Sequence, residues 1–196
     1  MKVQRIGSFA FPAADRHFQQ FDCDNYQREL YEQGMSRVKR KKVAVDVGAH
    51  VGLWTRRFAR EFDSVYAFEP QWENFLCLAR NVAGVTASVF VCQTGLGEKS
   101  GSGNLVNPAP TNSGAWEMRE GEGIPIRPLD SFNLCPGLIK IDVQGYEGRV
   151  LKGAMDTILR WSPVLIVENN GDVKEWIGWF PRYTAIELGK NVVAWC

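Results

Sequence analysis

Carboxylate side chains follow four apolar segments of this sequence, and each could stand at the end of a buried strand. They are Asp46, Glu69, Asp142 and Glu168. Each one alone could be an ordinary turn residue, but Asp46, Glu69 and Asp142 together are more than such turns require. A carboxylate at a strand end can accept hydrogen bonds from ribose hydroxyls or take a proton from a substrate. These residue types therefore indicate a site for a nucleoside-type cofactor and for proton transfer.

The segment 43–52, which reads VAVDVGAHVG, indicates how such a cofactor is held. Its first residues predict a buried parallel strand, and Gly48 and Gly52 predict a tight loop that leads into a helix. Such a loop brings backbone N–H groups close to a ligand. A dinucleotide fingerprint would have a glycine where this chain has His50, so the pattern argues against a pyrophosphate. The chain also lacks a GxxxxGK[ST] motif, which excludes a P-loop.

Strands and helices alternate along the rest of the chain. The pattern predicts strands at 43–47, 64–68, 88–92, 138–143 and 164–167, with helices at 53–61, 72–82 and 148–160. A helix capped by Asp24 is predicted from Asn25 to about Val38. Two final segments, 183–188 and 192–195, predict a hairpin. The alternation predicts an α/β fold with a mostly parallel sheet and helices on both faces, and the hairpin adds an antiparallel edge strand.

One domain is expected to cover residues 1–196, because no repeat or low-complexity linker interrupts the sequence. Within this domain, residues 1–42 are expected to form a preface that could cap a ligand, and residues 43–196 the core that carries the site. The Gly-, Ser- and Asn-rich segment 95–123 is long for a connection.

Composition narrows the expected partners and compartment. The formal net charge of +1 gives no strong field toward nucleic acid or an anionic membrane. Five widely spaced cysteines without a CxxC pair argue against a zinc site and a disulfide framework. The sequence shows no apolar signal core and no stretch approaching about 18 apolar residues. We therefore expect a cytoplasmic protein without a membrane partner.

Three motifs, in this order, resemble the FkbM-type methyltransferases. They read VDVGAHVG, VYAFEPQWENFLCLARNV and LIKIDVQGYEGRVLKGA, and the resemblance covers residues 43–196. It implies S-adenosylmethionine as the cofactor. It also implies the class I methyltransferase fold, which is Rossmann-like, with a mostly parallel seven-stranded sheet, helices on both faces and an antiparallel last strand.

The resemblance further implies which residues contact the cofactor. The loop under its methionine part would comprise Asp46, Gly48, Ala49, His50 and Gly52. Glu69 and Pro70 would hold the ribose, Gln93 and Thr94 would lie on the adenine side, and Asp142 would lie near the methionine amino group. One residue departs from the pattern, because family members commonly read DVEG where this chain has Gln144.

Methyl transfer to an alcohol needs alignment of the reacting atoms, exclusion of water and a base for the released proton. Asp142 is the first candidate for that base and His50 the second, although His50 could instead pack within its loop. Mg²⁺ could be held by Asp142, Glu147 and Glu168, but Glu147 also suits the first turn of a helix, and no metal site is predicted.

These features favour O-methylation of a hydroxyl on a small molecule or sugar. The DVQG sequence stands where amino-methylating enzymes of nucleic acids carry a [DN]PP[YF] loop, and the chain has no Pro-Cys pair. Both observations argue against a nucleic-acid acceptor. Methylation of nitrogen or of a macromolecule remains an alternative, as does a non-catalytic subunit that binds S-adenosylmethionine. The sequence names neither the acceptor nor the oligomeric state.

Overall fold

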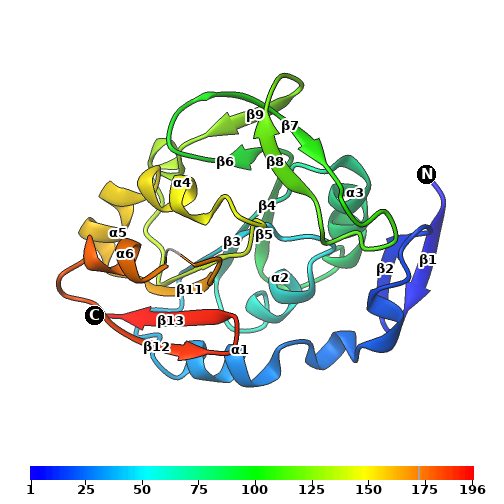
Figure 1. Ribbon diagram of the computed structural model, residues 1–196. Coiled ribbons are helices and arrows are strands. Elements are labelled where there is room, and N and C mark those ends of the chain that lie inside the picture. The colour runs from blue at the N-terminus through cyan, green and yellow to red at the C-terminus, as the bar shows by residue number, and fades with distance from the viewer. Residues whose placement is uncertain (172) are drawn as a thin grey trace.

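A seven-stranded sheet with the order β12-β13-β11-β10-β3-β4-β5 runs through the middle of the molecule (Figure 1). The computed structural model describes residues 1–171 and 173–196. The strands of this sheet are β3 (Val43–Val47), β4 (Ser64–Phe68), β5 (Ser88–Cys92), β10 (Leu138–Ile141), β11 (Val164–Glu168), β12 (Thr184–Leu188) and β13 (Asn191–Trp195). Strands β5, β4, β3, β10 and β11 pair in parallel, which confirms the predicted mostly parallel sheet.

The last strand is antiparallel, as predicted, but its expected position at the edge is wrong. β13 inserts between β11 and β12 and pairs antiparallel with both, so that β12 forms the edge. Side-chain burial explains this order. Residues 192–194 are buried and apolar, whereas β12 alternates between exposed and partly buried positions. An apolar strand gains more from two neighbours, and a more polar strand tolerates an edge.

Helices cover both faces of the sheet. One core cluster packs α1 (Arg28–Met35) and α2 (Leu53–Phe58) against one face, and a smaller cluster adds α3 (Trp72–Asn81) there. The other core cluster packs α4 (Glu147–Lys152), α5 (Met155–Trp161) and α6 (Val173–Gly178) against the opposite face. Short 3-10 turns lie at Phe18–Gln20, Cys23–Asn25 and Leu129–Phe132. No helix in the described ranges is long and apolar enough to cross a bilayer.

The predicted helices have different bounds in the structure. Helices α2 and α3 end at Phe58 and Asn81, before the predicted ends at residues 61 and 82. The first predicted helix, expected to begin at Asn25, begins at Arg28, because Gln27 adopts a left-handed conformation (φ 52°). Asp24 does not cap this helix, and it is Asp22 that caps the preceding 3-10 turn. The predicted helix 148–160 is broken into α4 and α5 at Gly153. A Cβ on Gly153 would lie 1.9 Å from the carbonyl oxygen of Gly97, so the backbones pack there in direct contact.

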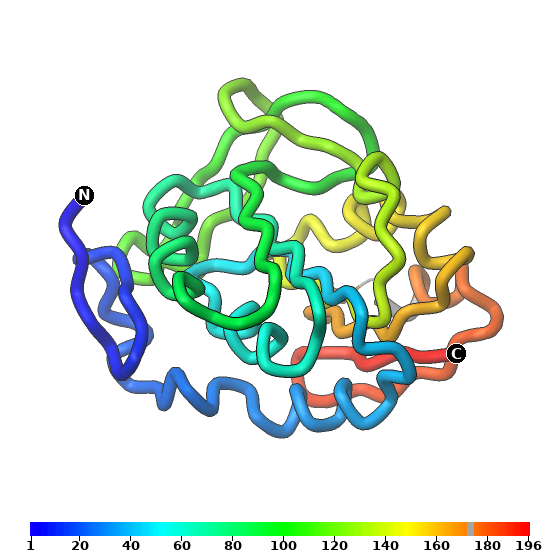
Figure 2. The backbone as a smooth tube through the Cα atoms, turned by 180° about the vertical axis from the view of Figure 1, so that it is seen from behind, coloured from blue at the N-terminus to red at the C-terminus, as the bar shows by residue number. Residues whose placement is uncertain are grey.

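The Gly-rich segment 95–123 forms strands instead of a long connection. With the following residues it builds a second sheet of the order β6-β9-β7-β8, made of β6 (Gly95–Leu96), β7 (Gly101–Val106), β8 (Glu117–Glu120) and β9 (Ile124–Arg127). A hairpin of β1 (Val3–Ile6) and β2 (Phe9–Pro12) begins the chain. Figure 1 shows the β7–β8 connection approaching β2 and α3, and Figure 2 shows the preface passing beneath the main sheet toward β12 and β13.

Candidate active site

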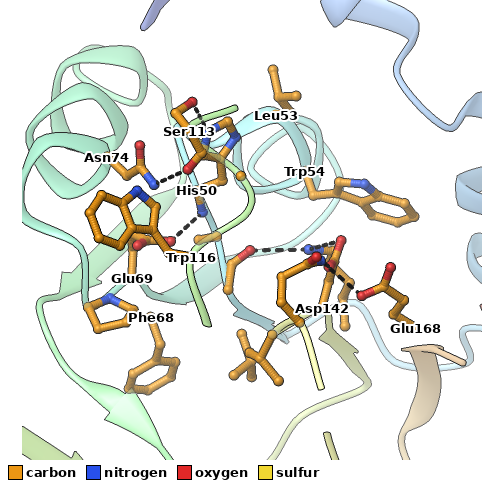
Figure 3. Close-up of a pocket in the computed structure, with 18 of the residues that line it drawn as sticks. His50, Leu53, Trp54, Phe68, Glu69, Asn74, Ser113, Trp116, Asp142 and Glu168 are labelled. Carbon is orange, nitrogen blue, oxygen red and sulfur yellow. Dashed lines mark hydrogen bonds and ion pairs between the residues drawn. The ribbon is translucent and has the colours of Figure 1, made fainter. Parts of the chain in front are cut away.

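A cavity of about 350 Å³ lies at the carboxyl ends of β3, β4, β10 and β11 (Figure 3). Parallel sheets of this kind bind their ligands at this edge. The preface contributes His17, Phe18, Tyr26 and Gln27 to its wall, and the β7–β8 connection contributes residues including Ser113 and Trp116. The wall is therefore assembled from segments far apart in the sequence.

The structure brings most of the predicted cofactor residues together in this cavity. Its lining includes Gly48, Ala49, His50, Glu69, Pro70, Thr94 and Asp142. Three other candidates, Asp46, Gly52 and Gln93, do not line it. Gln93 is exposed, whereas Asp46 is fully buried beneath the cavity floor.

Glu69 connects the end of β4 to the loop after β3. Its Oε2 accepts the backbone N–H of His50 at 2.8 Å, and its Oε1 accepts that of Gln71 at 2.9 Å. The side chain is 5% exposed, and this burial raises the pKa of Glu69 to about 7, although the two backbone hydrogen bonds oppose the rise. Glu69 is thus a buried carboxyl group that changes charge near neutral pH.

The loop after β3 packs directly on the end of β10. Gly48 has φ +73°, and a Cβ there would lie 1.9 Å from the carbonyl oxygen of Asp142. A glycine is therefore required at this position. His50 also has a left-handed φ of 52°, which is unusual for a residue with a side chain and is held by its hydrogen bond to Glu69.

A buried lysine, which the sequence analysis missed, lies beneath this loop. In-register pairing of β3 and β10 places Lys140 directly beside Asp46. The Lys140 Nζ lies 3.5 Å from Asp46 Oδ1, 3.6 Å from Asp142 Oδ2 and 3.3 Å from the carbonyl oxygen of Gly48. Burial alone would lower the pKa of Lys140, but the charges of Asp142 and Asp46 outweigh it and raise that pKa. A lysine within the otherwise apolar LIKI strand was the signal for this ion pair.

Asp46 lies beneath the cavity floor and links the elements that support it. Its Oδ2 accepts the hydroxyl of Thr55 on α2 at 2.6 Å, so the carboxylate links β3, α2 and Lys140. This position explains why Asp46 does not line the cavity, although it holds residues that do.

The carboxyl groups of Asp142 and Glu168 lie near each other at one end of the cavity, on the same side as Trp54 (Figure 3). The Gln144 amide donates to Asp142 Oδ1 and to Glu168 Oε2, both at 2.9 Å, and so bridges them. Burial, followed by the charges of Asp142 and Glu147, raises the pKa of Glu168 to about 7. The amide of Gln144 thus supplies donors where a glutamate would add a third carboxylate.

Glu147 serves the local backbone. Its carboxylate is fully buried and accepts the N–H groups of Val143 and Gly145 and the amide of Asn170. Within the described ranges, no group of three or more His, Cys, Asp or Glu side chains is arranged to hold a metal ion.

At the other end of the cavity, His50 joins two residues that the sequence analysis did not identify. Its Nε2 lies 2.7 Å from the Ser113 hydroxyl, and that hydroxyl lies 2.6 Å from Asp15 Oδ2. The imidazole packs against Phe18, with ring centroids 4.9 Å apart. Burial lowers the pKa of His50 to about 4, although the charge of Asp15 acts in the opposite direction. No spacing in the sequence relates these residues, which only the fold brings together.

Comparison with known families shows the family to which the chain belongs. The model of the methyltransferase FkbM domain matches residues 46–186. The chain belongs to the FkbM methyltransferase family. Its fold is that of the class I methyltransferases, as predicted. No curated protein matches the sequence at a significant level.

Solved structures similar to this chain agree on the fold. The methyltransferase FkbM of Methylobacillus flagellatus KT is 22% identical, with a TM-score of 0.57 over 80% of this chain and 44% of its own. The 16S rRNA N2 G1207 methyltransferase of T. thermophilus, in complex with AdoMet and guanosine, is 11% identical, with a TM-score of 0.57 over 100% of this chain and 49% of its own. The precorrin 8w decarboxylase of Methanobacterium thermoautotrophicum is 14% identical, with a TM-score of 0.54, and 97% of its length is covered.

The chain thus spans less than half the length of the first two of these proteins. At these identities the likeness shows the fold alone. The expectation that nucleic acid is not the acceptor therefore stays a prediction, since one of the similar structures is an RNA methyltransferase.

Proposed function

We propose that this FkbM methyltransferase binds S-adenosylmethionine in the cavity and methylates a hydroxyl of a small molecule or carbohydrate. The observation that carries the proposal is the placement of Glu69 and Asp142 in one cavity, with the Gly48–His50 loop between their strands. This arrangement offers one carboxylate for a ribose and another for the cationic part of the cofactor.

The donor groups present fit this cofactor. Each Glu69 oxygen accepts one backbone N–H, and each retains the capacity to accept a ribose hydroxyl. Pro70 and Thr94 line the cavity near Glu69 along the chain and would lie on the nucleoside side. In this proposal Asp46 and Gly52 shape the loop that contacts the cofactor, whereas Gln93, which is exposed and does not line the cavity, contributes less to the adenine side.

The opposite end of the cavity carries carboxyl groups, whose negative charge suits a sulfonium and an ammonium group. Asp142 and Glu168 are held together by Gln144, and Lys140 offsets part of the charge of Asp142. When bound, S-adenosylmethionine supplies a methyl group on a positively charged sulfur, which leaves with the electron pair of the broken bond. A cation close to both carboxyl groups would relieve their mutual repulsion.

Proton removal would fall to the same pair of carboxyl groups. Asp142 lines the cavity and is the predicted base. In the free protein the pKa of Glu168 is about 7, which lies near the working pH of most enzymes. We propose that Glu168 takes the proton of the acceptor hydroxyl and that Asp142 orients the reacting groups through Gln144.

Ligand-dependent thermal unfolding tests the cofactor assignment. At about 100 times its dissociation constant, a ligand adds about 2.7 kcal/mol of stability. For a chain of this size we expect S-adenosylmethionine and S-adenosylhomocysteine to raise Tm by roughly 5–11 °C. Glu69→Gln should remove most of this shift, while Glu73→Gln, which changes an exposed acid on α3, should keep it. A shift with NAD and none with the adenosyl compounds would contradict the proposal.

Transfer of a labelled methyl group tests the acceptor class. Hydroxylated small molecules and sugars should take up the label from S-adenosylmethionine, and RNA should not. Label that appears in RNA or on nitrogen would replace the proposed acceptor by one of the alternatives. Binding without any transfer over all acceptor pools would instead support a non-catalytic subunit.

A further inference from the structure

Three segments that are far apart in the sequence meet at the imidazole of His50. Asp15 comes from the preface, Ser113 from the β7–β8 connection and His50 from the loop after β3. Asp15 and Ser113 are 1% and 6% exposed, so water cannot readily exchange with the hydrogen bonds between them. Figure 3 shows the Ser113 hydroxyl directed at the His50 ring.

The available donors and acceptors determine which atom donates in each hydrogen bond between Asp15, Ser113 and His50. The Asp15 carboxylate accepts the backbone N–H of Phe18 at 2.9 Å and that of Ser113 at 2.8 Å. A carboxylate can only accept, so the Ser113 hydroxyl at 2.6 Å must donate its single proton to Asp15. The Ser113 oxygen can then only accept from His50, whose Nε2 must carry a hydrogen.

The other ring nitrogen of His50, Nδ1, has no hydrogen-bond partner among the described residues. Among the described residues, the fully buried side-chain nitrogen and oxygen atoms without a hydrogen bond are Asp46 Oδ1 and Asn74 Oδ1. His50 Nδ1 is not one of these two atoms, so it keeps some exposure, and His50 is a residue of the cavity wall. Burial also lowers the pKa of His50 to about 4, which keeps the ring neutral near pH 7.

We propose that Asp15 and Ser113 are positioning residues that hold His50 as its Nε2–H tautomer, so that Nδ1 presents a lone pair to a donor on the bound ligand. That donor is a hydroxyl or ammonium group, carried either by the cofactor or by the acceptor. The role of the ligand rests on the proposed function, whereas the tautomer belongs to the free protein and can be measured without any ligand.

Nitrogen NMR of the histidine rings tests the tautomer directly. The chain contains two histidines, so a His17→Gln variant assigns the signals of His50. In long-range ¹H–¹⁵N spectra of the free protein at pH 7.5, we expect His50 Nε2 to resonate as a protonated nitrogen and Nδ1 as an unprotonated one. Protonated Nδ1, or averaged shifts for the two nitrogens, would overturn the proposal.

Ser113→Ala tests the positioning role, because it removes the hydroxyl and leaves the backbone N–H on Asp15. We expect the two nitrogen shifts of His50 to converge, as in a mixture of tautomers. Ser131→Ala removes an exposed hydroxyl that bonds to Pro128 and should keep the wild-type spectrum. A wild-type pattern in Ser113→Ala would show that the hydroxyl does not set the tautomer.

Addition of S-adenosylhomocysteine identifies the source of the donor. A shift of the Nδ1 signal on binding assigns the donor to the cofactor, and binding without such a shift assigns it to the acceptor. If this compound produces no thermal stabilisation, the proposed function fails while the tautomer result stands.

Discussion

Lys140→Met should destabilise the protein strongly, because Lys140 is the cation beside a fully buried Asp46. Removing one partner of a buried ion pair costs about 3–5 kcal/mol. The 3.5 Å separation from Asp46 Oδ1 is longer than a good hydrogen bond, so we expect a loss at the lower end, about 3 kcal/mol. For a chain of this size this corresponds to a fall in Tm of roughly 6–12 °C.

Urea unfolding followed by tryptophan fluorescence at pH 7.5 measures this loss. The double variant Asp46→Asn with Lys140→Met removes both charges and should recover to within about 1 kcal/mol of wild type.

A surface ion pair provides the matched control for Lys140→Met. Lys41 lies 2.7 Å from Glu61, with both side chains more than 40% exposed, and Lys41→Met should cost less than about 1 kcal/mol. The reasoning is refuted if Lys140→Met costs no more than this control. It is also refuted if the double variant is as unstable as Lys140→Met alone.

Three further predictions concern the cavity. Gly48→Ala should lower the free energy of unfolding by at least about 3 kcal/mol, because its Cβ would meet the Asp142 carbonyl. Gly145→Ala, where φ is +93° and no atom lies nearby, should lower it by about 1–2 kcal/mol, and equal losses in thermal unfolding would contradict the close-packing argument. Cofactor affinity measured by calorimetry should weaken roughly tenfold from pH 8 to pH 6 through Glu69 alone, because its pKa is about 7 and its ionised form is the better acceptor for hydroxyls. Glu69→Gln should bind more weakly at both pH values and keep only the dependence that Glu168, whose pKa is also about 7, contributes at the cationic end. Gln144→Glu should lower stability in urea by about 1–2 kcal/mol at pH 8 and by less at pH 6, since it places a third carboxylate between two others; a loss that does not vary with pH would argue against repulsion.

Much of the sheet could be predicted because its strands read as short apolar runs, of which β3, β10 and β11 are buried on both faces. Strands β3, β4 and β5 begin and end where the sequence pattern places them. Glu69 and Asp142 could be predicted for a related reason, since polar residues that follow such strands all emerge at one edge of a parallel sheet. The order of β12 and β13 could not, because a hairpin pattern does not show on which side the final strand pairs.

The second sheet and part of the cavity wall depend on contacts that leave no pattern in the sequence. Segment 95–123 reads as a connection because its glycines lack side chains, yet Gly103 is needed because a Cβ there would lie 2.9 Å from the backbone carbonyl oxygen of Arg119. The break of the predicted helix 148–160 at Gly153 likewise depends on a close contact with Gly97 that the sequence does not show.

The sequence by itself determined the fold class and the carboxylates at the strand ends, because burial periodicity and glycine loops are local properties of the chain. The tertiary structure alone decided that Lys140 neutralises Asp46, that Gln144 bridges Asp142 and Glu168, and that Asp15 reaches His50 through Ser113. Apart from the contact of Gln144 with Asp142, these contacts join residues from different segments, and their distances and protonation states depend on packing and burial that no single segment encodes.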